Sequence, residues 1–421
     1  HMTESMIDTK VLFIAYNFPP AGGPGVQRST KFVKYLPEFG WRPLVVATTP
    51  DAGSVRDESL LDDIPTDTPI WRVPGFSIAR LQNHLDRYGL AKLAVGVNLL
   101  LQIPDAARFW ARNTHATVSR IIEAEKPQVI YTTSGPYSAH LVGMWARRKF
   151  QLPWFADFRD PWSNNLVMPY PPGIRTLNQL LERQVLGVAD RVACVSRPWL
   201  DDLRDNLGRD AHKFIVLPNG YDADDVRPLP MPAATEKFTL THIGSLYRNR
   251  KPDTLIEAVE LLCSQERIPE RQLHVLFVGR NVAGKVPDRP PFEVHGYVPH
   301  EELNRFRRQT NVCVLILDTS PDNLGTPSGK IYEYMASNRP ILGIVPPGGV
   351  AEQLIQKTRT GIAVNGEVRA IADAIEKLYH RWKSGDSAWD PDWDLIQQYS
   401  RRNLTARLAR ELDRTEGSEA S

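Results

Sequence analysis

Residues 325–336 combine small side chains, a cation and an acid at spacings that can do chemistry. Ser328 and Gly329 precede a predicted helix, whose first backbone N–H groups and positive dipole end favour a phosphate. Lys330 adds a positive charge in the first turn. Because helical side chains lean toward the N-terminus, Glu333 can reach a hydroxyl beside that phosphate. The segment therefore indicates phosphate and ribose binding, and the alternative is an ordinary helix start with a solvated lysine and glutamate.

A second chemically rich segment, residues 157–162, follows an apolar strand predicted at 153–156. It contains Asp157, Arg159 and Asp160, followed directly by a proline that ends the strand. These charged groups therefore gather in one loop at a strand end. The loop suits a functional site, and the alternative is a structural ion pair that involves Arg159.

Two adjacent glycines, Gly22 and Gly23, follow the first predicted strand at 11–15. Glycine lets the backbone come close to a ligand in the crevice at the carboxyl ends of a parallel sheet. The spacing is not that of the G-x-G-x-x-G dinucleotide fingerprint. The glycines therefore predict either close approach to a ligand or turn geometry alone.

The elements that must position these segments alternate between apolar strands and helices. Strands are predicted at 11–15, 44–47, 70–73, 128–131, 153–156, 191–196, 214–217, 239–243, 273–278, 292–295, 312–317, 341–345 and 362–364. The main helices are predicted after the glycine loop, within 76–126, over 177–187, up to residue 263, from residue 368 and over 392–413. Alternation of this kind predicts two doubly wound α/β domains.

The boundaries follow from length and local composition. At 421 residues the chain is too long for one compact core. Residues 223–237 are rich in Pro, Ala and Asp, lack periodicity and are interpreted as an interdomain linker. We expect a Rossmann-like domain over residues 1–225, a second one over 238–395, and a final helix in 396–421 that crosses back to the first domain.

The overall composition is that of an ordinary globular protein, with 42% hydrophobic and 24% charged residues. The net charge of +2 is too small to suggest a nucleic-acid partner. The three cysteines lie in or beside apolar runs without metal-ligand spacing, and we expect reduced thiols in a cytosolic protein. His1 and Met2 resemble a tag remnant, and no signal peptide is expected after them.

One apolar stretch, residues 90–103, is too short to span a bilayer. Together with the basic residues 147–149, it suggests peripheral contact with a membrane. The alternative is a buried core helix and a solvated basic helix end. We therefore expect a cytoplasmic protein, with peripheral contact at the inner face of the membrane as a further expectation.

Five segments, in this order and in these strand–loop contexts, resemble the glycosyltransferases of the GT-B fold, family 4 type. They are residues 18–23, 195–196, 218–220, 244–246 with the basic residues that follow, and 329–336. The loop at 157–162 is similar to a subgroup found in bacterial capsule and envelope polysaccharide clusters. The resemblance covers nearly the whole chain. It implies two Rossmann-like domains that face a cleft, and a retaining enzyme that moves a hexose from a UDP- or GDP-sugar to an envelope or capsule glycan, lipid-linked acceptors included.

The resemblance also implies roles for the cations. Lys330 and a basic residue of the loop at 248–251 would hold the diphosphate and neutralise leaving-group charge. We favour Arg250, because Ser245 stands where many relatives place an arginine. For Arg248 and Lys251 the alternative is solvated surface charge.

The remaining donor contacts carried over from the family are mostly small or backbone groups. Glu333 would bind the ribose hydroxyls, and the amides of Ser328 and Gly329 would cap the phosphate. Gly22 and Gly23 would approach the donor phosphate and sugar. The other expected donor-binding residues are Thr326, Arg280, Tyr297 and Val298. The turns that contain the last three would recognise the base through backbone groups, and the base could be uracil or guanine.

On the donor side, one departure from the family pattern means that the identity of the donor sugar is not predicted. The family places a first glutamate eight residues before Glu333, and that position is Gly325. Asp322 or Asn323 are the possible substitutes.

On the acceptor side, many relatives carry a histidine where this chain has Asp157. A carboxylate there could orient or deprotonate an acceptor hydroxyl, or stabilise positive charge that develops on the sugar. His140 is the alternative catalytic residue, and it could equally be a hydrogen-bonded structural histidine. Arg159, Asp160 and Trp162 complete the expected acceptor side.

No Asp-x-Asp motif lies in a suitable place, so no metal or cofactor is expected, and Lys, Arg and backbone dipoles would do what Mg²⁺ does elsewhere. Two rival functions remain. One is a nucleotide-sugar 2-epimerase on the same fold. The other is a non-catalytic paralogue that binds a nucleotide or glycan. This alternative remains because Gly325 and Ser245 replace a glutamate and an arginine that relatives have at these positions.

Overall fold

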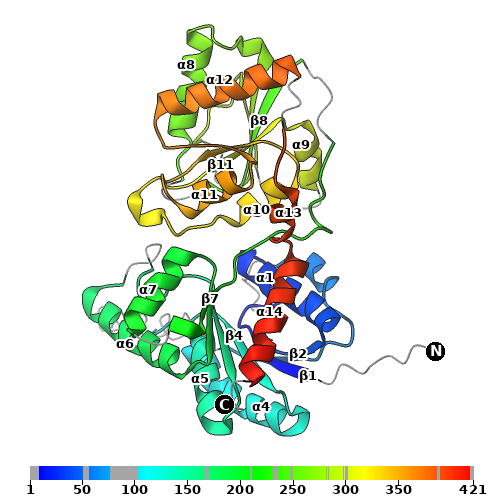
Figure 1. Ribbon diagram of the computed structural model, residues 1–421, viewed down its shortest axis with the longest axis vertical. Coiled ribbons are helices and arrows are strands. Elements are labelled where there is room, and N and C mark those ends of the chain that lie inside the picture. Colours follow the sequence, from blue (N-terminus) through cyan, green and yellow to red (C-terminus); the bar gives the residue numbers. More distant parts are fainter. Residues whose placement is uncertain are drawn as a thin grey trace, which may run out of the picture. The chain divides into compact units, whose positions relative to one another are not determined.

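The computed structural model divides the chain into two compact units. Unit 1 comprises His1–Pro218 and Arg401–Ser421, and unit 2 comprises Asn219–Ser400. The structure describes residues 9–50, 56–75, 103–165, 170–208, 211–230, 236–246, 250–280, 282, 284–296, 298, 302–385 and 389–417. Figure 1 labels many of the elements of both units.

Unit 1 is built on a seven-stranded parallel sheet of order β3-β2-β1-β4-β5-β6-β7. Its strands are β1 (Thr9–Ile14), β2 (Trp41–Thr48), β3 (Ile70–Val73), β4 (Val129–Thr133), β5 (Trp154–Phe158), β6 (Arg191–Cys194) and β7 (Phe214–Val216). Its helices are α1 (Pro24–Tyr35), α4 (Arg108–Glu125), α5 (Ser138–Phe150), α6 (Pro172–Val188), α7 (Arg197–Leu207) and α14 (Arg401–Glu416), with 3₁₀ turns η1 (Leu36–Phe39), η2 (Glu58–Leu61) and η3 (Ala211–Lys213).

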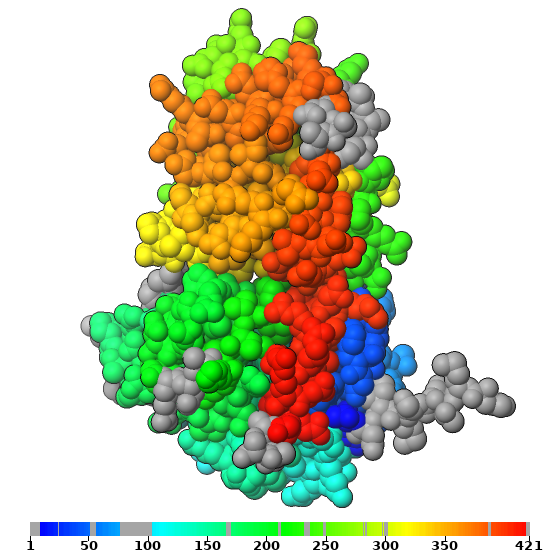
Figure 2. Space-filling view, viewed as in Figure 1, coloured from blue at the N-terminus to red at the C-terminus, as the bar shows by residue number. Residues whose placement is uncertain are grey.

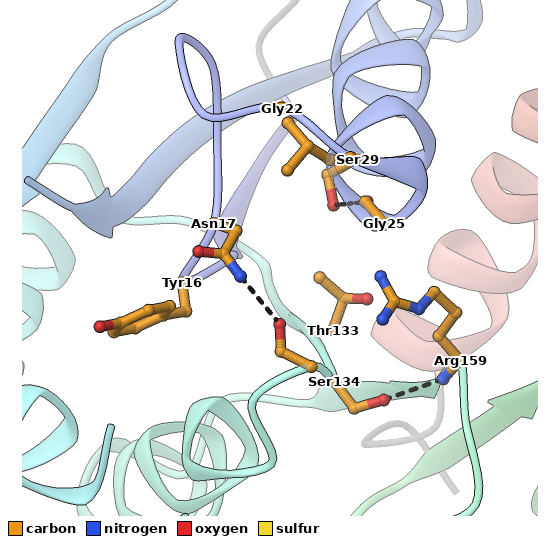
Figure 3. Close-up of a pocket in the computed structure, with 11 residues that line it drawn as sticks. Tyr16, Asn17, Gly22, Gly25, Ser29, Thr133, Ser134 and Arg159 are labelled. Carbon is orange, nitrogen blue, oxygen red and sulfur yellow. Dashed lines mark hydrogen bonds between the residues drawn. The ribbon is translucent and has the colours of Figure 1, made fainter. Parts of the chain in front are cut away.

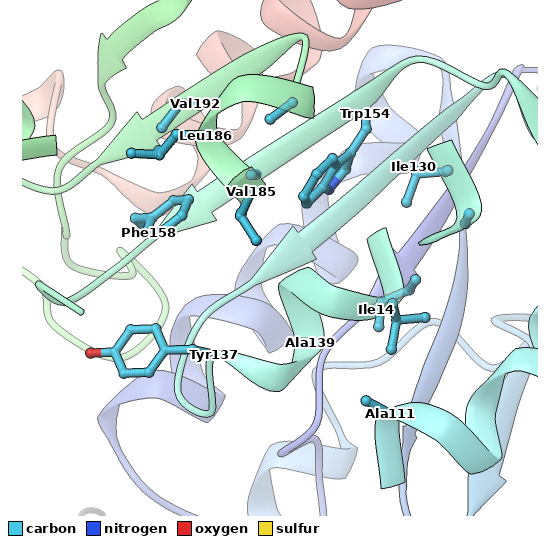
Figure 4. Packing of buried hydrophobic residues seen from close by; sticks show 14 of the residues in the cluster. Ile14, Ala111, Ile130, Tyr137, Ala139, Trp154, Phe158, Val185, Leu186 and Val192 are labelled. Carbon is cyan, nitrogen blue, oxygen red and sulfur yellow. The ribbon is translucent and has the colours of Figure 1, made fainter. Parts of the chain in front are cut away.

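The strands of unit 1 are apolar on both faces because helices cover both faces of the sheet. Along β1, Leu12 and Ile14 join one buried cluster, whereas Val11 and Phe13 join another. The first cluster packs against α4, α5, α6 and α7, and Figure 4 shows part of it. The second packs against α1 and α14.

The C-terminal helix α14 is part of unit 1. Leu404, Leu408 and Leu412 recur every four residues, are fully buried and pack with Phe32 of α1. Trp41 Nε1 donates to the Asp413 carboxylate at 2.9 Å. In the space-filling view the outer side of α14, in red, lies at the surface of this unit (Figure 2).

Unit 2 is built on a six-stranded parallel sheet of order β10-β9-β8-β11-β12-β13. Its strands are β8 (Phe238–Ile243), β9 (Leu273–Val278), β10 (Phe292–His295), β11 (Val312–Ile316), β12 (Ile341–Ile344) and β13 (Gly361–Val364). Its helices are α8 (Asp253–Ser264), α9 (Leu303–Gln309), α10 (Gly329–Ala336), α11 (Val350–Lys357), α12 (Val368–Ser384) and α13 (Trp393–Gln397), with 3₁₀ turns η4 (Glu270–Gln272) and η6 (Pro321–Asn323).

Both parallel sheets carry helices on both faces, which confirms the predicted doubly wound α/β class. Two helical regions differ from the sequence patterns. Helix α11 was not predicted, and the helix predicted over 392–413 is two helices, α13 and α14, that are separated at residues 398–400.

The unit boundaries fall at 218/219 and 400/401 rather than at 225 and 395. Contacts within unit 2 explain the shift. Tyr221 N–H donates to Tyr399 O at 3.1 Å, and Val226 and Ile396 are buried in a cluster of unit 2. Part of the predicted linker is also attached there, because Leu229 N–H donates to Ser337 O at 3.2 Å.

Strand order in each sheet reverses direction beside the strand that comes first in that unit. In unit 1 the reversal lies between β1 and β4, and in unit 2 it lies between β8 and β11. Ligands of open α/β sheets bind in the crevice at the carboxyl ends of such strands. The loops after these four strands are therefore where a site is expected.

Within the described residues, no helix is long and apolar enough to cross a membrane. Residues 90–102 of the apolar stretch considered for membrane contact lie outside the described residues.

Candidate active site

Unit 1 has a cavity of about 150 Å³ at its strand-order reversal (Figure 3). Three loops and one helix start surround it. They are residues 16–23 after β1, the first turns of α1, residues 133–135 at the end of β4, and Arg159 after β5. Gly22 and Gly23, expected at the donor, and Arg159, expected on the acceptor side, therefore line one cavity.

Gly23 begins α1 in a backbone conformation that favours glycine, with φ of 119°. No side chain caps this helix start, and its first turn contains no acidic residue. The glycine therefore brings an uncapped helix N-terminus to the cavity. Such a terminus carries a partial positive charge.

The Arg159 guanidinium occupies space that only glycines leave open. A Cβ built on Gly25 would lie 1.3 Å from Arg159 Nη1, and one built on Gly135 would lie 2.7 Å from Nη2. The backbone N–H of Arg159 donates to Ser134 Oγ at 3.0 Å. Asp160 pairs with the guanidinium, with Oδ2 at 2.9 Å from Nε and 2.7 Å from Nη2. The ion pair expected as an alternative for this loop therefore forms between neighbours, Arg159 and Asp160.

Asp157 requires a correction, because it does not line the cavity. Its side chain is fully buried inside β5. One oxygen, Oδ2, accepts from Arg28 Nε at 2.9 Å and from the Tyr131 hydroxyl at 2.6 Å, and Oδ1 accepts from Arg28 Nη2 at 3.1 Å. Burial, with the Asp157 charge beside it, raises the pKa of Tyr131 well above its usual value. Asp157 is therefore the buried counter-ion of Arg28 and does not line the cavity.

His140 is corrected for the same reason. It is fully buried, its Nδ1 lies 2.7 Å from Thr132 Oγ1, and its ring stacks on Phe158. Burial lowers the pKa of His140 to about 3, so the ring is neutral at neutral pH. His140 is therefore a hydrogen-bonded structural histidine, which was the alternative interpretation for this residue.

Trp162 also belongs to the core and not to an acceptor surface. It is fully buried, stacks on Tyr137 and donates from Nε1 to Asn178 Oδ1 at 2.8 Å. Of the expected acceptor-side residues, Arg159 lines the cavity, and Asp160 is the ion-pair partner of Arg159.

In unit 2 the segment at 328–333 forms the start of α10, after the loop that follows β11. Ser328 Oγ accepts from Lys330 N–H at 3.4 Å and caps the helix. The first turn contains no acid, and the Lys330 side chain is 32% exposed. This helix start can therefore present amide groups and an ammonium group to an anion.

Glu333 is held by two cations. Its Oε2 lies 2.7 Å from Arg307 Nη2 and 3.5 Å from Lys330 Nζ. The Arg307 side chain, from α9, is only 3% exposed. Sequence patterns did not single out Arg307, since a basic residue near a helix end has no distinctive spacing.

The end of β8 lies beside α10. Tyr334 Oη accepts from Ile243 N–H at 2.9 Å. His242, near the same strand end, is buried, with Nδ1 at 3.0 Å from Val314 O. Burial, with smaller contributions from the positive charges of Arg250 and Lys330, lowers the pKa of His242 to about 4.

The loops after β8 and β9 are in close backbone contact. A Cβ on Gly279 would lie 2.1 Å from Gly244 O, so a side chain at this position would collide with backbone. Leu246 N–H donates to Arg280 O at 3.3 Å. Four other expected donor residues are at least partly exposed: Ser245, Lys251, Arg280 and Val298. Arg248 and Tyr297 lie outside the described residues.

Comparisons with known proteins match both halves of the chain. A family model described as a glycosyl transferase 4-like domain matches residues 22–220, and one described as glycosyl transferases group 1 matches residues 237–381. The chain belongs to the GT-B glycosyltransferases.

Individual relatives of this glycosyltransferase are distant. The D-inositol 3-phosphate glycosyltransferase of Gordonia bronchialis is 31% identical over 116 residues, which cover 26% of this chain and 25% of that protein. The sucrose-phosphate synthase from Thermosynechococcus elongatus is 15% identical with a TM-score of 0.64, over 98% of this chain and 100% of that one. A putative UDP-N-acetylglucosamine 2-epimerase from Listeria monocytogenes is 12% identical with a TM-score of 0.52, over 95% and 94% of the two chains. The structural likenesses confirm the predicted GT-B fold.

In this glycosyltransferase the position of the missing family glutamate, Gly325, is buried in the loop between β11 and α10. Asn323 is engaged within that loop, because Nδ2 donates to Asp318 O at 2.9 Å and Oδ1 accepts from the Thr326 hydroxyl. Asp322 is exposed. Of the two possible substitutes, Asp322 is the exposed one and the one that has a carboxylate.

Proposed function

We propose that the protein is a retaining glycosyltransferase that moves a hexose from a UDP- or GDP-sugar to a cell-envelope or capsule glycan, lipid-linked acceptors included. Unit 2 binds the nucleotide, and unit 1 binds the acceptor. The capped start of α10, which holds Lys330 in its first turn and Glu333 one turn further on, carries the proposal.

Lys330 and Arg250 suit the charge that develops on the leaving group. When the glycosidic bond breaks, negative charge accumulates on the nucleoside diphosphate. Lys330 supplies an ammonium group, Arg250 a guanidinium, and the first amides of α10 supply aligned dipoles. Groups that are already in place when the charge appears lower the barrier without reorganisation.

Glu333 is the proposed ribose ligand. Its carboxylate lies one turn beyond the phosphate-binding end of α10, and Arg307 fixes its Oε2. A carboxylate is a good acceptor for the two ribose hydroxyls, because hydrogen bonds to charged acceptors are about twice as strong as neutral ones. The nucleoside and the diphosphate are thus recognised by neighbouring groups on one helix.

The deciding experiment is a thermal-shift panel of UDP- and GDP-sugars, followed by transfer assays with those that bind. Nuclear magnetic resonance of the product should show that the anomeric configuration of the donor is kept. Binding of neither nucleotide would contradict the proposal. Incubation with UDP-N-acetylglucosamine alone tests the rival epimerase, which would release an epimer without any acceptor.

A further inference from the structure

A buried histidine, His242, lies at the strand-order reversal of unit 2, the unit that is proposed to bind the donor. We propose that His242 takes up a proton when the diphosphate of a nucleotide-sugar binds, and so becomes a further positive group of the donor site. The inference rests on the proposed function, because the diphosphate is what drives the proton uptake. Such a group is charged only while the donor is bound.

The carboxyl ends of β8 and β11 diverge at His242. Backbone pairing between the two strands ends at Thr241 and Cys313, although both strands continue beyond these residues. At the next position the strands are joined by a side chain, because His242 Nδ1 lies 3.0 Å from Val314 O. The imidazole ring therefore lies between two strand ends at the strand-order reversal, which is where open α/β sheets bind their ligands.

The contact with Val314 determines which ring nitrogen carries the proton. A carbonyl oxygen only accepts hydrogen bonds, so Nδ1 is the protonated nitrogen of the neutral ring. Nε2 then has only a lone pair. It is buried and, in the described part of the chain, has no hydrogen-bond partner. His242 can therefore accept a proton at Nε2 without breaking an existing hydrogen bond.

Glycine at position 244 leaves Nε2 uncovered on the side of the loop that follows β8. A Cβ built on Gly244 would lie 3.4 Å from Nε2, in contact with it. The backbone of Gly244 also favours the charged form of the ring. Protonation turns Nε2 from an acceptor into a donor, and a backbone acceptor is then already beside it.

The charged groups that act on the ring, among the described residues, are both positive. Burial, with the charges of Arg250 in the loop after β8 and Lys330 on α10, lowers the pKa of His242 to about 4. The neighbours from the adjoining strands are uncharged. They are the Val314 carbonyl of β11 and the Phe277 ring of β9, whose centroid lies 5.9 Å from that of His242. Without a ligand the ring is therefore neutral at neutral pH.

A bound diphosphate opposes the two charges that keep the ring neutral. Arg250 and Lys330 are the cations expected to hold the diphosphate, so its negative charge offsets theirs. A nearby negative charge also raises the pKa of a histidine directly, because it favours the charged form. The ring then takes a proton from the solvent. By linkage, protonation of His242 strengthens nucleotide-sugar binding by the same factor.

The first test counts protons. Binding of UDP-glucose, UDP-N-acetylglucosamine and GDP-mannose to the full chain is measured by titration calorimetry at pH 6, in two buffers of different ionisation enthalpy, neither of them phosphate. Nucleotide-sugars are used because their diphosphate does not titrate near neutral pH. The parent should take up part of a proton for each ligand bound, and less at pH 7.5. Binding without proton uptake at pH 6 would overturn the proposal.

The variant His242→Asn removes the titratable nitrogen and keeps the contact with β11. The asparagine Nδ2 can take the place of His242 Nδ1 and donate to Val314 O, whereas nothing replaces Nε2. In the parent, the Kd should fall roughly two- to fourfold from pH 7.5 to pH 6. In His242→Asn the proton uptake and this pH dependence should both disappear. Uptake equal to that of the parent would assign the proton to another group and overturn the proposal.

The matched control is His274→Asn, in the same sheet. His274 also places Nδ1 near a neighbouring strand, 3.4 Å from Thr239 Oγ1, but it lies at the amino end of β9 and not at the carboxyl ends. The control should bind with the proton uptake and pH dependence of the parent. Equal losses in the control and in His242→Asn would indicate general damage to the sheet and would contradict the proposal.

A third measurement follows the ring of His242 directly. Nuclear magnetic resonance of the ten histidine rings gives their pKa values with and without the nucleotide-sugar. The signal of His242 is the one missing from His242→Asn or, if that variant does not fold, from His242→Gln. Its pKa should be higher with the ligand bound, and an unchanged pKa would overturn the proposal. If the parent binds none of the nucleotide-sugars, the proposed function fails together with this proposal, whereas binding without protonation of His242 contradicts this proposal alone.

Discussion

Arg307 and Glu333 form a nearly buried ion pair in unit 2, with Nη2 and Oε2 2.7 Å apart. The two residues belong to different helices, α9 and α10, and are 26 positions apart in the chain. Arg307 also donates from Nη1 to Asn304 Oδ1 at 3.2 Å, which fixes its position on α9. The proposed ribose ligand is therefore set in place before a nucleotide arrives, and such preorganisation reduces the cost of binding.

The pair predicts that nucleoside recognition and diphosphate recognition can be separated. Arg307→Gln should raise the Kd for UDP or GDP roughly tenfold, because Glu333 loses the charge-assisted contact that orients it. The Kd for pyrophosphate should change little. Titration calorimetry with both ligands measures the difference. Arg308→Gln, an exposed neighbour on the same helix, is the control. An equal loss for pyrophosphate would show that the fold, not the ribose contact, was damaged.

Lys330 is predicted to act mainly on the diphosphate. Lys330→Ala should weaken binding of the nucleoside diphosphate by roughly ten- to a hundredfold. Its side chain is 32% exposed, so the free energy of unfolding should change little. Lys357→Ala, which removes an exposed lysine at the end of α11, should bind as the parent does. Parent-like binding by Lys330→Ala would mean that the diphosphate site lies elsewhere.

Asp157 is predicted to matter for stability rather than chemistry. Asp157→Asn leaves the buried Arg28 guanidinium without its counter-ion, which should lower the free energy of unfolding by about 3–5 kcal/mol. Removing both charges, as in Arg28→Met with Asp157→Leu, should cost less than the sum of the single changes, because no charge is then left unpaired. Urea unfolding of Asp157→Asn, of Arg28→Met and Asp157→Leu singly, and of the double variant measures these differences. A variant Asp157→Asn that keeps its stability but loses transfer activity would return Asp157 to a catalytic role.

His140 is predicted to make unit 1 less stable in acid. Burial lowers the pKa of His140 to about 3, below the usual value near 6.5 that it has when unfolded. The unfolded chain therefore binds a proton that the folded chain does not. The stability from the neutral ring is fully present above pH 6.5 and is lost as the pH falls. Between pH 7 and pH 5 the loss should be about 2 kcal/mol.

Urea unfolding at the two pH values tests the His140 prediction, with His140→Gln as the comparison. The pH slope should be smaller in the variant, because glutamine does not titrate. Identical slopes in the variant and the parent would mean that His140 does not contribute to the acid sensitivity.

The C-terminal helix is predicted to be essential to the core of unit 1. Leu408→Ala should lower the free energy of unfolding by about 2–5 kcal/mol, because the leucine is fully buried between helix and sheet and its loss leaves a cavity. Arg410→Ala, on the exposed side of the same helix, should have little effect. Urea unfolding compares the two, and equal stabilities would contradict the packing.

The fold was largely predictable because its strands are continuous apolar segments. The predicted bounds of β3, β9 and β10 match the structure residue for residue. A strand that is covered on both faces must be apolar throughout, so its signal is local and needs no knowledge of distant residues. Helix α11 was missed because its eight residues provide only about two turns of periodicity.

The expectation that Asp157 lies in the loop after its strand was wrong for an equally local reason. The predicted strand at 153–156 is two residues short at its end, since β5 continues to Phe158. Asp157 is therefore inside the strand, where it pairs with Thr133 and Ala193 in register, and its side chain points into the core. The sequence shows only that an aspartate follows apolar residues. Whether that aspartate lies inside the strand or in the loop after it depends on how far the neighbouring strands pair with it.

The helix start at 328–333 was determined by its own sequence, since capping, dipole and spacing are properties of adjacent residues. The groups that surround this helix start in the folded chain could not be predicted from its own sequence. Arg307 reaches Glu333 from another helix, and the cavity around Arg159 is assembled from loops that follow β1, β4 and β5. Only the folded sheet decides such groupings, because strand order, and not order along the chain, brings the carboxyl ends of β1, β4 and β5 side by side.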